Sequence, residues 1–455
     1  GEEFGPTNEE ALAVIYGENY RAADCYVSFE YTQITCFTAE GTGRNHDLYI
    51  TVGGQDSNVY PANISYSRPT VSFYEIAANL EGIQTPGGDW LIIEGDSFGT
   101  AAENAIDFVS YGKTGTEFTA CDAVDGGDCG CRIVEDHYMM NCTTVPGAGA
   151  ELFVTLYING QKSKLPTIDY LPPIISELSG PGSADAQTKG GDQITITGEN
   201  FGPLGNAYID SVTYGPVFAT EYEAVGCNVV GSVSAQMIDG VEVDGGHSTI
   251  VCNLTEGLGK DHRWYVTIDG QTSDKSENLT NYKKPYIAQF NVTSEQQVCD
   301  LSADSYETRC TYSTNGGEDF GVIAGTNLGH AVSSSYFSVL VDGVVIAIDG
   351  GSTYQMDPAT TVTYAWTGDD GTEYIKFVMP ELPGENHTVD IAVLVDNSVI
   401  DDVSQTSDPV THLYQKPVIT NLLNTLVEGS ENAVDLQIEG FNFGTKGHVY
   451  INGVE

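Results

Sequence analysis

The sequence predicts an all-β protein, an elongated array of tandem β-sandwich domains, and three observations lead to this prediction. Short apolar runs alternate with clusters of turn residues, and the chain contains 52 glycines and 26 tyrosines. No long amphipathic helical pattern is present, and no apolar run approaches the roughly 20 residues that a membrane span needs. Three sequence marks recur in a fixed order along the 455 residues. At roughly 100–200 residues per domain, this length has room for about three to five domains.

The first mark is a glycine-framed turn of the form G-x-x-F-G, in which Leu328 replaces the phenylalanine in one of the five copies. A glycine pair precedes three of the turns (Gly87–Gly88, Gly190–Gly191 and Gly316–Gly317), and an alternating stretch such as Ile194 and Ile196 follows the pair. Alternation of this kind predicts a strand with one buried face, and Phe201 is expected to close the end of the core. The five turns span Gly1–Gly5, Gly95–Gly99, Gly198–Gly202, Gly325–Gly329 and Gly440–Gly444.

The second mark is Y-x-x-P-x-[IV], which contains the pairs Tyr66 and Pro69, Tyr170 and Pro173, Tyr282 and Pro285, and Tyr414 and Pro417. Proline fixes φ and lacks an amide donor, so each mark predicts a stiff start to an edge strand and a short linker. We expect each linker tyrosine to pack against the following proline and the next domain; carbohydrate stacking is the alternative role. The predicted units are 1–66 (unit one, partial), 67–170 (unit two), 171–282 (unit three), 283–414 (unit four, divergent, with an insertion) and 415–455 (unit five, partial).

The third mark begins with a cysteine five residues before a glycine, at Cys36, Cys142 and Cys252. It continues through G-x-G into an apolar strand that ends in G-Q-x-S, as at Gly54–Ser57, Gly160–Ser163 and Gly270–Ser273. Unit four keeps "MPELPG" (Met379–Gly384) but lacks this cysteine and the G-Q-x-S ending. Units of about 100–130 residues made of short strands favour an immunoglobulin-like sandwich.

This order of marks resembles the IPT/TIG domain, the immunoglobulin-like module of plexins and related receptors. The residues that carry the resemblance are Pro173–Gly202, Ile250–Gly259 and Val266–Ser273, and the pattern covers the chain as three complete and two partial units. Unit four departs from it, because Cys299 and Cys310 lie in an insertion before its glycine pair. The resemblance implies a β-sandwich with a role in adhesion or assembly and no catalytic residues. Similar modules contact DNA in Rel-type transcription factors, but the charge of this chain opposes that role.

The ten cysteines suggest pairing within units: Cys25–Cys36, Cys121–Cys142, Cys227–Cys252 and Cys299–Cys310, with Cys129–Cys131 as the remaining pair. A bond between residues two apart in an extended chain is near the geometric limit, although Gly130 allows a kink. Four cysteines allow three connectivities, so Cys121–Cys129 with Cys131–Cys142, or a crossed pair, remain open.

The chain has 64 acidic and 17 basic residues, a net charge of −47, which disfavours nucleic acid and anionic membranes as partners. Even cysteines and N-x-[ST] sequons predict a secreted or cell-surface glycoprotein with N-linked glycans. No cofactor is expected, and no calcium-hand motif supports bound calcium. The six sequons begin at Asn63, Asn141, Asn253, Asn278, Asn291 and Asn386.

No catalytic motif is present, and the protein is not expected to be an enzyme. His46, His262 and His387 each stand three residues after a glycine, at the start of the same predicted strand. Because a catalytic residue would normally appear once, this recurrence predicts a structural position.

Gly1 and Gly5 lie in the turn of a unit without its preceding strands, and Gly440 and Gly444 lie in the turn of a unit that stops soon after. Either the chain is a window on a longer tandem protein, or residues 417–455 of one copy complete residues 1–66 of another by strand donation. Such head-to-tail contacts generate filaments. The sequence therefore predicts an extracellular structural glycoprotein of a rod, fibril or surface hair. The alternative is the ligand-binding ectodomain of a receptor or adhesin, with Thr363–Tyr374 of unit four as the expected binding segment.

Overall fold

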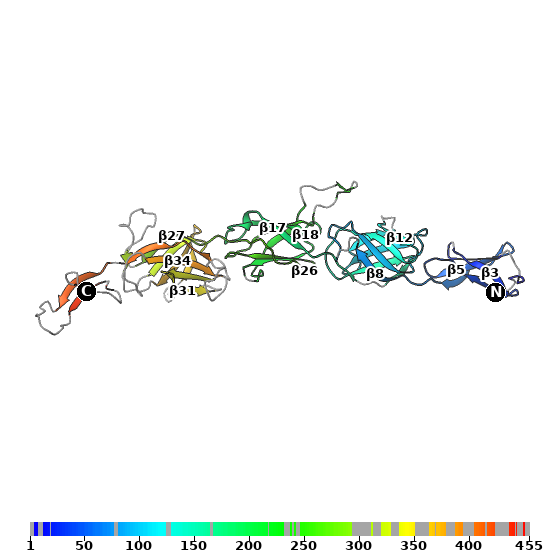
Figure 1. Cartoon of the computed structure of the whole chain (residues 1–455), viewed down its shortest axis with the longest axis horizontal. Helices are drawn as coiled ribbons and strands as arrows, with labels where there is room; N and C mark the ends of the chain where they lie inside the picture. The colour runs from blue at the N-terminus through cyan, green and yellow to red at the C-terminus, as the bar shows by residue number, and fades with distance from the viewer. Residues whose placement is uncertain are drawn as a thin grey trace.

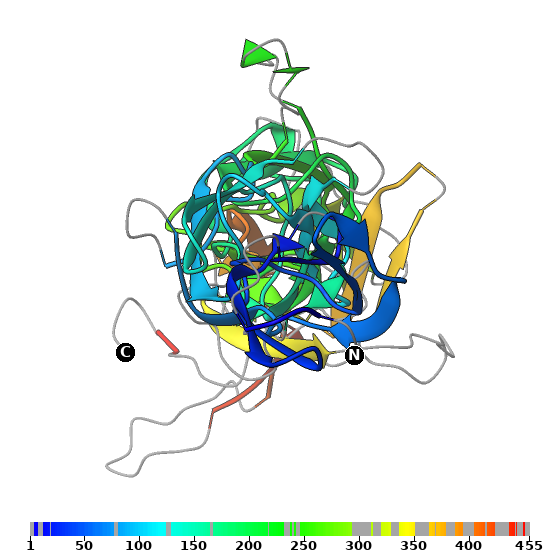
Figure 2. The ribbon, with the colours of Figure 1, turned by 90° about the vertical axis from the view of Figure 1, so that its right-hand side faces the viewer.

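The computed structural model describes residues 4–7, 12–18, 20–76, 81–123, 129–163, 167–216, 218–231, 237–238, 241–242, 246–293, 311–312, 320–328, 336–350, 364–368, 370–378, 387–394, 405–414, 416–423, 436–441, 443 and 449–450. It is an all-β, elongated tandem array of immunoglobulin-like sandwiches. The units follow one another along a rod (Figure 1) and overlap when viewed along it (Figure 2). Within the described residues the one helix is the short 3₁₀ turn η1 (Pro181–Ser183).

Unit two is a sandwich of two antiparallel sheets around one core. One sheet has the order β12-β13-β9-β8, and the other has the order β11-β10-β14-β15 with β16 paired to β14. The core lies between the sheets and includes Leu91, Phe98, Val109, Met140 and Leu156. The strands are β8 (Thr70–Ile76), β9 (Trp90–Asp96), β10 (Ile106–Gly112), β11 (Phe118–Asp122), β12 (Cys131–Glu135), β13 (Met139–Thr143), β14 (Leu152–Ile158), β15 (Gln161–Lys162) and β16 (Thr167–Ile168).

Unit three repeats this arrangement with the sheets β17-β18-β24-β21 and β20-β19-β25-β26. The predicted alternation is confirmed on β18, where Ile194 and Ile196 are fully buried, and Phe201 is buried after the turn. A hairpin, β22–β23, lies apart from the body of the rod (Figure 1). The strands are β17 (Ile174–Ser179), β18 (Gln193–Glu199), β19 (Ile209–Gly215), β20 (Tyr222–Glu223), β21 (Val225–Val229), β22 (Met237–Ile238), β23 (Val241–Glu242), β24 (Thr249–Asn253), β25 (Arg263–Ile268) and β26 (Gln271–Thr272).

Unit four keeps the two-sheet plan, with β27-β29-β33-β32 in one sheet. The second sheet has the order β28-β36-β34-β30-β31, with β35 paired to β34. The strands are β27 (Tyr286–Thr293), β28 (Thr311–Tyr312), β29 (Phe320–Thr326), β30 (Tyr336–Val341), β31 (Val344–Gly350), β32 (Tyr364–Thr367), β33 (Glu373–Val378), β34 (His387–Leu394), β35 (Gln405–Thr406) and β36 (Val410–Tyr414).

Unit one has only part of this plan. Its larger sheet, β2-β1-β5-β6 with β7 paired to β5, matches the second sheet of unit two strand for strand. Its other sheet is the two-stranded β3–β4, the counterpart of β12–β13. The strands are β1 (Leu12–Tyr16), β2 (Tyr20–Arg21), β3 (Ala23–Phe29), β4 (Gln33–Phe37), β5 (His46–Val52), β6 (Gln55–Asp56) and β7 (Tyr60–Ile64).

Unit five is a hairpin of β37 (Val418–Leu423) and β38 (Gln437–Phe441). Its pairing repeats that of the first two strands of units two, three and four. Gly440 faces Ile419 before a register shift, as Gly95 faces Val71, Gly198 faces Ile175 and Gly325 faces Ile287. A side chain at Gly198 would collide with the carbonyl oxygen of Ile174, which explains why glycine recurs there. In units two, three and four this first strand is an edge strand, as the proline mark predicts.

Candidate functional site

The linker tyrosines fold back into their own units. Tyr170 and Tyr282 are buried, and their hydroxyl groups donate hydrogen bonds of 2.7 Å to the carbonyl oxygens of Val145 and Thr255. Tyr66 makes the same bond to Ala39 at 2.8 Å. The hydroxyl groups of these three residues therefore bond within their own units, and packing of the rings against the following proline and the next domain stays a prediction. For Tyr170 and Tyr282 the burial also leaves no ring face for a sugar. The side chain of Tyr414 lies outside the described residues.

Glycine is required where the ring of the linker tyrosine packs. A Cβ at Gly257 would lie 2.6 Å from Tyr282 Cε2, and one at Gly147 would collide with the Tyr170 hydroxyl oxygen. The partners that sequence reasoning missed are Tyr16, Tyr111 and Tyr214, whose hydroxyl groups lie 2.6–3.3 Å from that of the linker tyrosine. Their common signal is a Tyr-Gly pair at the end of a strand. The linker tyrosine thus anchors each linker to the unit before it.

The joint itself is made by the backbone of the linker tyrosine and a glutamine of the next unit. Gln161 Nε2 donates to the Tyr66 carbonyl oxygen at 3.0 Å, and Gln271 Nε2 donates to that of Tyr170 at 2.8 Å. Gln405 Nε2 donates to the Tyr282 carbonyl oxygen at 2.7 Å. The same hydrogen bond therefore closes all three joints among units one to four.

Each glutamine is held by the serine two positions later. The Ser273 hydroxyl oxygen accepts a hydrogen bond from the Val266 amide at 3.1 Å, and Ser407 accepts one from Ile391 at 3.0 Å. Unit four therefore has a Gln-x-Ser ending, Gln405–Ser407, with Ser404 in place of the glycine of G-Q-x-S. Residues 395–404 separate β34 from Gln405, whereas two residues separate β25 from Gln271, and this difference in spacing concealed the match in the sequence.

A second contact recurs at the joints. The middle residue of G-x-G in one unit packs against the last glycine of the G-x-x-F-G turn in the next. Thr42 contacts the position of Gly99, and Ala148 contacts that of Gly202. Ala148 is fully buried and belongs to the core of unit three although it comes from unit two. The joints are thus extensions of the domain cores rather than flexible hinges.

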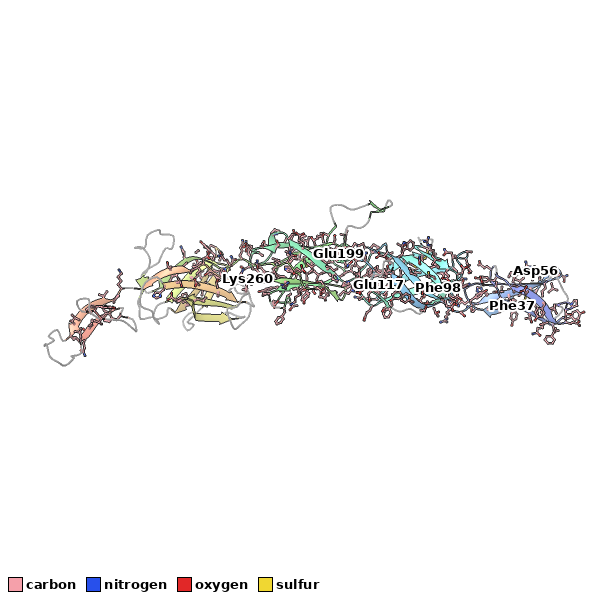
Figure 3. All side chains as sticks on the ribbon, in the orientation of Figure 1. Phe37, Asp56, Phe98, Glu117, Glu199 and Lys260 are labelled. Carbon is pink, nitrogen blue, oxygen red and sulfur yellow. A yellow bond between two sulfur atoms is a disulfide. The ribbon has the colours of Figure 1, made fainter. Side chains whose placement is uncertain are left out.

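Charged contacts at the joints are exposed. Lys284 Nζ lies 2.9 Å from Asp408, and Lys113 pairs with Asp269 between units two and three. Exposed ion pairs contribute roughly 0–1 kcal/mol, so the buried contacts dominate the joints. Figure 3 shows Glu117 beside the joint between units two and three and Lys260 beside the joint between units three and four.

The face of the hairpin in unit five that would point into a sandwich is exposed. Leu422 and Leu436 are 43% and 38% exposed, whereas their counterparts in unit three, Leu178 and Ile194, are 9% and 0% exposed. Pro417 is exposed, while Pro69, Pro173 and Pro285 are buried. The hairpin therefore has the side chains of a sandwich sheet without the opposing sheet among the described residues.

Unit one has the complementary opening. In units two and three the counterpart of β4 pairs on its second edge with β9 or β18. Within the described residues, β4 pairs with β3 alone. Ile34 and Cys36 are half-buried, whereas their counterparts Ile250 and Cys252 are buried. Among the described residues, every strand of unit two except β8 and β9 has a counterpart in unit one, and β37–β38 is the counterpart of that pair. Gly5 and Gly440 lie within the described residues, and Gly1 and Gly444 lie outside them.

Among the described residues four disulfides are formed, and Cys25–Cys36 and Cys227–Cys252 match the repeat. The predicted Cys121–Cys142 and Cys129–Cys131 are wrong, because the bonds are Cys121–Cys129 and Cys131–Cys142. Cys131 and Cys142 face each other on β12 and β13, and Cys121 faces Cys129, each pair with Cα atoms 4.0 Å apart. Both Cys25–Cys36 and Cys131–Cys142 have a sequence separation of 11, a signal that could have identified the pairing. Cys299 and Cys310 lie outside the described residues.

Two sequon asparagines, Asn253 and Asn278, have exposed side chains. Asn141 is half-buried in the middle of a sheet, on β13 between β12 and β9. Asn63 lies on β7 and Asn291 lies on β27, and the structure describes the backbone but not the side chain of each. Asn386 lies outside the described residues. Among the sequon side chains that the structure describes, those of Asn253 and Asn278 are therefore the accessible ones.

The histidine position at the start of the strand is structural in two units. His46 Nε2 lies 2.9 Å from the Thr42 carbonyl oxygen, and His262 is buried among Tyr214, Tyr222 and Tyr282. Burial lowers the pKa of His262 to about 4. Unit two has the buried Leu152 at the same position. His387 begins β34 and contacts Asp342 at 2.5 Å.

The described residues contain no group of three or more histidine, cysteine, aspartate or glutamate side chains arranged to hold a metal ion. Among these residues no helix has the length and apolar character required to cross a bilayer. Within the predicted binding segment Thr363–Tyr374, residues 364–367 form β32, which pairs with β33 as β12 pairs with β13. This part of the segment is thus an ordinary hairpin of the sandwich.

No protein-family model matches the chain, and no curated protein matches it. Among solved structures, it is similar to domains 4–9 of the surface layer protein SbsC, with 10% identity, a TM-score of 0.15, and coverage of 78% of this chain and 49% of that one. It is also similar to a D1–D4 ectodomain fragment of ICAM-5, with 8% identity, a TM-score of 0.20, and coverage of 77% and 79%. A marsupial T cell receptor matches at 8% identity and a TM-score of 0.18, over 75% of this chain and 100% of that one.

Proposed function

We propose that this chain is an extracellular structural glycoprotein of TIG-type units that assembles head to tail into a fibre. In each junction, the β37–β38 hairpin of one copy completes unit one of the next copy. The observation that carries the proposal is the complementarity just described: unit one has counterparts of all strands of unit two except β8 and β9, and the exposed hairpin repeats the pairing of those two strands.

The hairpin and the opening lie at opposite ends of the rod (Figure 1). The contact therefore joins the hairpin of one copy to the opening of another in a head-to-tail manner that does not close. A strand added to an open sheet edge gains main-chain hydrogen bonds, and burial of its apolar side chains gives affinity. Each large side chain buried in this way contributes roughly 1.5–3 kcal/mol.

The register of the added strand follows from the complete units. Met139 faces Glu94 in unit two and Thr249 faces Thr197 in unit three. The same register places Glu439 of one copy opposite Gln33 of the next, and Ile438 opposite Ile34. Ile438 would then occupy the position of Ile93 and Ile196, both of which are buried.

The extracellular location is supported by the four disulfides, which persist in oxidising compartments, and by the exposed sequon residues Asn253 and Asn278. The mechanism is mechanical: joints that share core residues keep successive units aligned, and the sheets and disulfides resist extension. The net charge of −47 keeps fibres soluble and separate.

The test compares the chain with two variants by light scattering and negative-stain electron microscopy. Wild-type protein should form fibres longer than one rod, and Ile438→Asp should remain as single rods because the charge cannot enter the core. The control Gln437→Asp adds the same charge to the outer face of β38 and should still assemble. Single rods of wild-type protein at high concentration would overturn the proposal.

A further inference from the structure

The hairpin β5–β6 of unit one carries a glutamine whose counterparts all close a joint. Gln55 occupies the position of Gln161, Gln271 and Gln405 at the start of the short strand that follows the turn. Ser57 supports it as Ser273 supports Gln271: the Ile50 amide donates to the Ser57 hydroxyl oxygen at 3.0 Å. The local structure that presents the joint glutamine is therefore fully formed in unit one.

Gln55 differs from its counterparts in having no hydrogen-bond partner for its side chain among the described residues. Its side chain is exposed, and within the described residues no group accepts a hydrogen bond from its amide. Gln161, which closes the first joint, is buried. Figure 3 shows the neighbouring Asp56 on the N-terminal unit.

The direction of β5 places Gln55 at the end of unit one that faces away from unit two. His46, the first residue of β5, lies beside Thr42, and Thr42 contacts Glu103 of unit two at 3.2 Å. The strand then continues to Val52, which at about 3.3 Å per residue is about 20 Å further along. The turn Gly53–Gly54 and Gln55 therefore face outward from the rod.

We propose that Gln55 of one copy donates a hydrogen bond to the backbone carbonyl of Tyr414 of a second copy. This inference rests on the proposed head-to-tail assembly. In this assembly the donor is the copy that supplies β37–β38, and the acceptor is the copy whose unit one is completed. The completed unit follows unit four of the donor in the same way that unit four follows unit three. Tyr414 is the linker tyrosine at that boundary, in the position of Tyr66, Tyr170 and Tyr282, whose carbonyl oxygens accept the glutamine in every joint that the structure describes.

The consequence is that the contact between copies has two separate parts. The hairpin supplies affinity, and the Gln55 bond fixes the angle between the completed unit and unit four of the donor. The fibre then has the same joint between copies as within a copy, and its stiffness is uniform along its length.

The experiment measures two quantities on full-length protein: dissociation of fibres on dilution, followed by light scattering, and the bend at each joint in electron micrographs. Gln55→Leu should still assemble, because β37–β38 is intact. Its fibres should dissociate about fivefold faster, the effect of losing about 1 kcal/mol from one hydrogen bond, and should bend once per copy. Asn58→Leu, a nearby exposed position, should behave as wild type.

The outcomes separate the two proposals. If wild-type protein never assembles, the head-to-tail proposal fails and this inference falls with it. If wild type assembles and Ile438→Asp does not, but Gln55→Leu dissociates and bends as wild type does, head-to-tail assembly stands and the Gln55 contact is wrong. Faster dissociation with bends restricted to the junction between copies supports the contact.

Discussion

Gln271 donates a hydrogen bond from Nε2 to the backbone carbonyl oxygen of Tyr170, 2.8 Å away across the joint between units two and three. The tyrosine belongs to the earlier unit, because its ring is buried there and its hydroxyl group bonds to Val145. The glutamine belongs to the later unit, where Ser273 holds its short strand. One hydrogen bond thus joins two independently anchored residues, and equivalent bonds occur at the other two joints.

Replacing Gln271 with leucine should loosen this joint without unfolding either unit. The change leaves the Tyr170 carbonyl without its partner and removes a hydrogen bond of about 0.5–1.5 kcal/mol. Small-angle scattering should show a shorter maximum dimension, and micrographs should show a wider range of angles between units two and three. Gln193→Leu, an exposed glutamine on β18, is the matched control and should leave both measurements unchanged. An unaltered angle distribution in Gln271→Leu would show that Ala148 and its neighbours suffice to hold the joint.

The sequence predicted the fold well where the signal is a local backbone requirement. The first glycine of this turn recurs in units two to five because a neighbouring carbonyl occupies the space of a side chain, and Ile194 and Ile196 alternate because one face of β18 is buried. The joint was harder to predict because its hydrogen-bond acceptor is the backbone carbonyl of Tyr170. Every residue type has a backbone carbonyl, so the sequence does not identify this acceptor. The sequence pattern pointed instead to the ring of Tyr170, which is buried in its own unit.

The stability of unit three should fall as the pH is lowered through the range set by His262. Its ordinary pKa is about 6.5, and burial lowers the pKa to about 4 in the folded state. Between these values the unfolded chain binds the proton and the folded chain does not, so unfolding becomes more favourable as the pH falls from about 6.5 to about 4. Thermal or denaturant unfolding of the chain from pH 7 to pH 4 measures this effect.

The control comes from unit two, where Leu152 is buried at the same position. His262→Leu should remain folded and should lose this part of the pH dependence, because leucine takes up no proton. A variant with the same slope as the wild type would assign the dependence to other groups.

The disulfide assignment in unit two predicts distinct thiol counts for paired substitutions. Removing Cys131 and Cys142 together should leave Cys121–Cys129 intact and no free thiol, at a cost of about 2–4 kcal/mol in unfolding free energy. Removing Cys121 and Cys142 together takes one partner from each bond, so Cys129 and Cys131 should become reactive to alkylation. Mass spectrometry after alkylation under denaturing conditions measures both. The reverse pattern would restore the pairing Cys121–Cys142 and Cys129–Cys131.

Added salt should promote assembly of the chain rather than dissolve it. With a net charge of −47, two copies repel one another as they approach, and the proposed contact between β38 and β4 is formed by apolar side chains and main-chain hydrogen bonds. The screening length falls from about 30 Å at 0.01 M salt to about 8 Å at 0.15 M, so the repulsion weakens while burial of Leu436 and Ile438 is unaffected. The elongation rate, followed by light scattering, should therefore rise over this range. Ile438→Asp should stay unassembled at every salt concentration, because its defect is the buried charge and not the approach of the two copies. Fibres that dissociate as salt is added would mean that ion pairs, and not the apolar hairpin, hold the copies together.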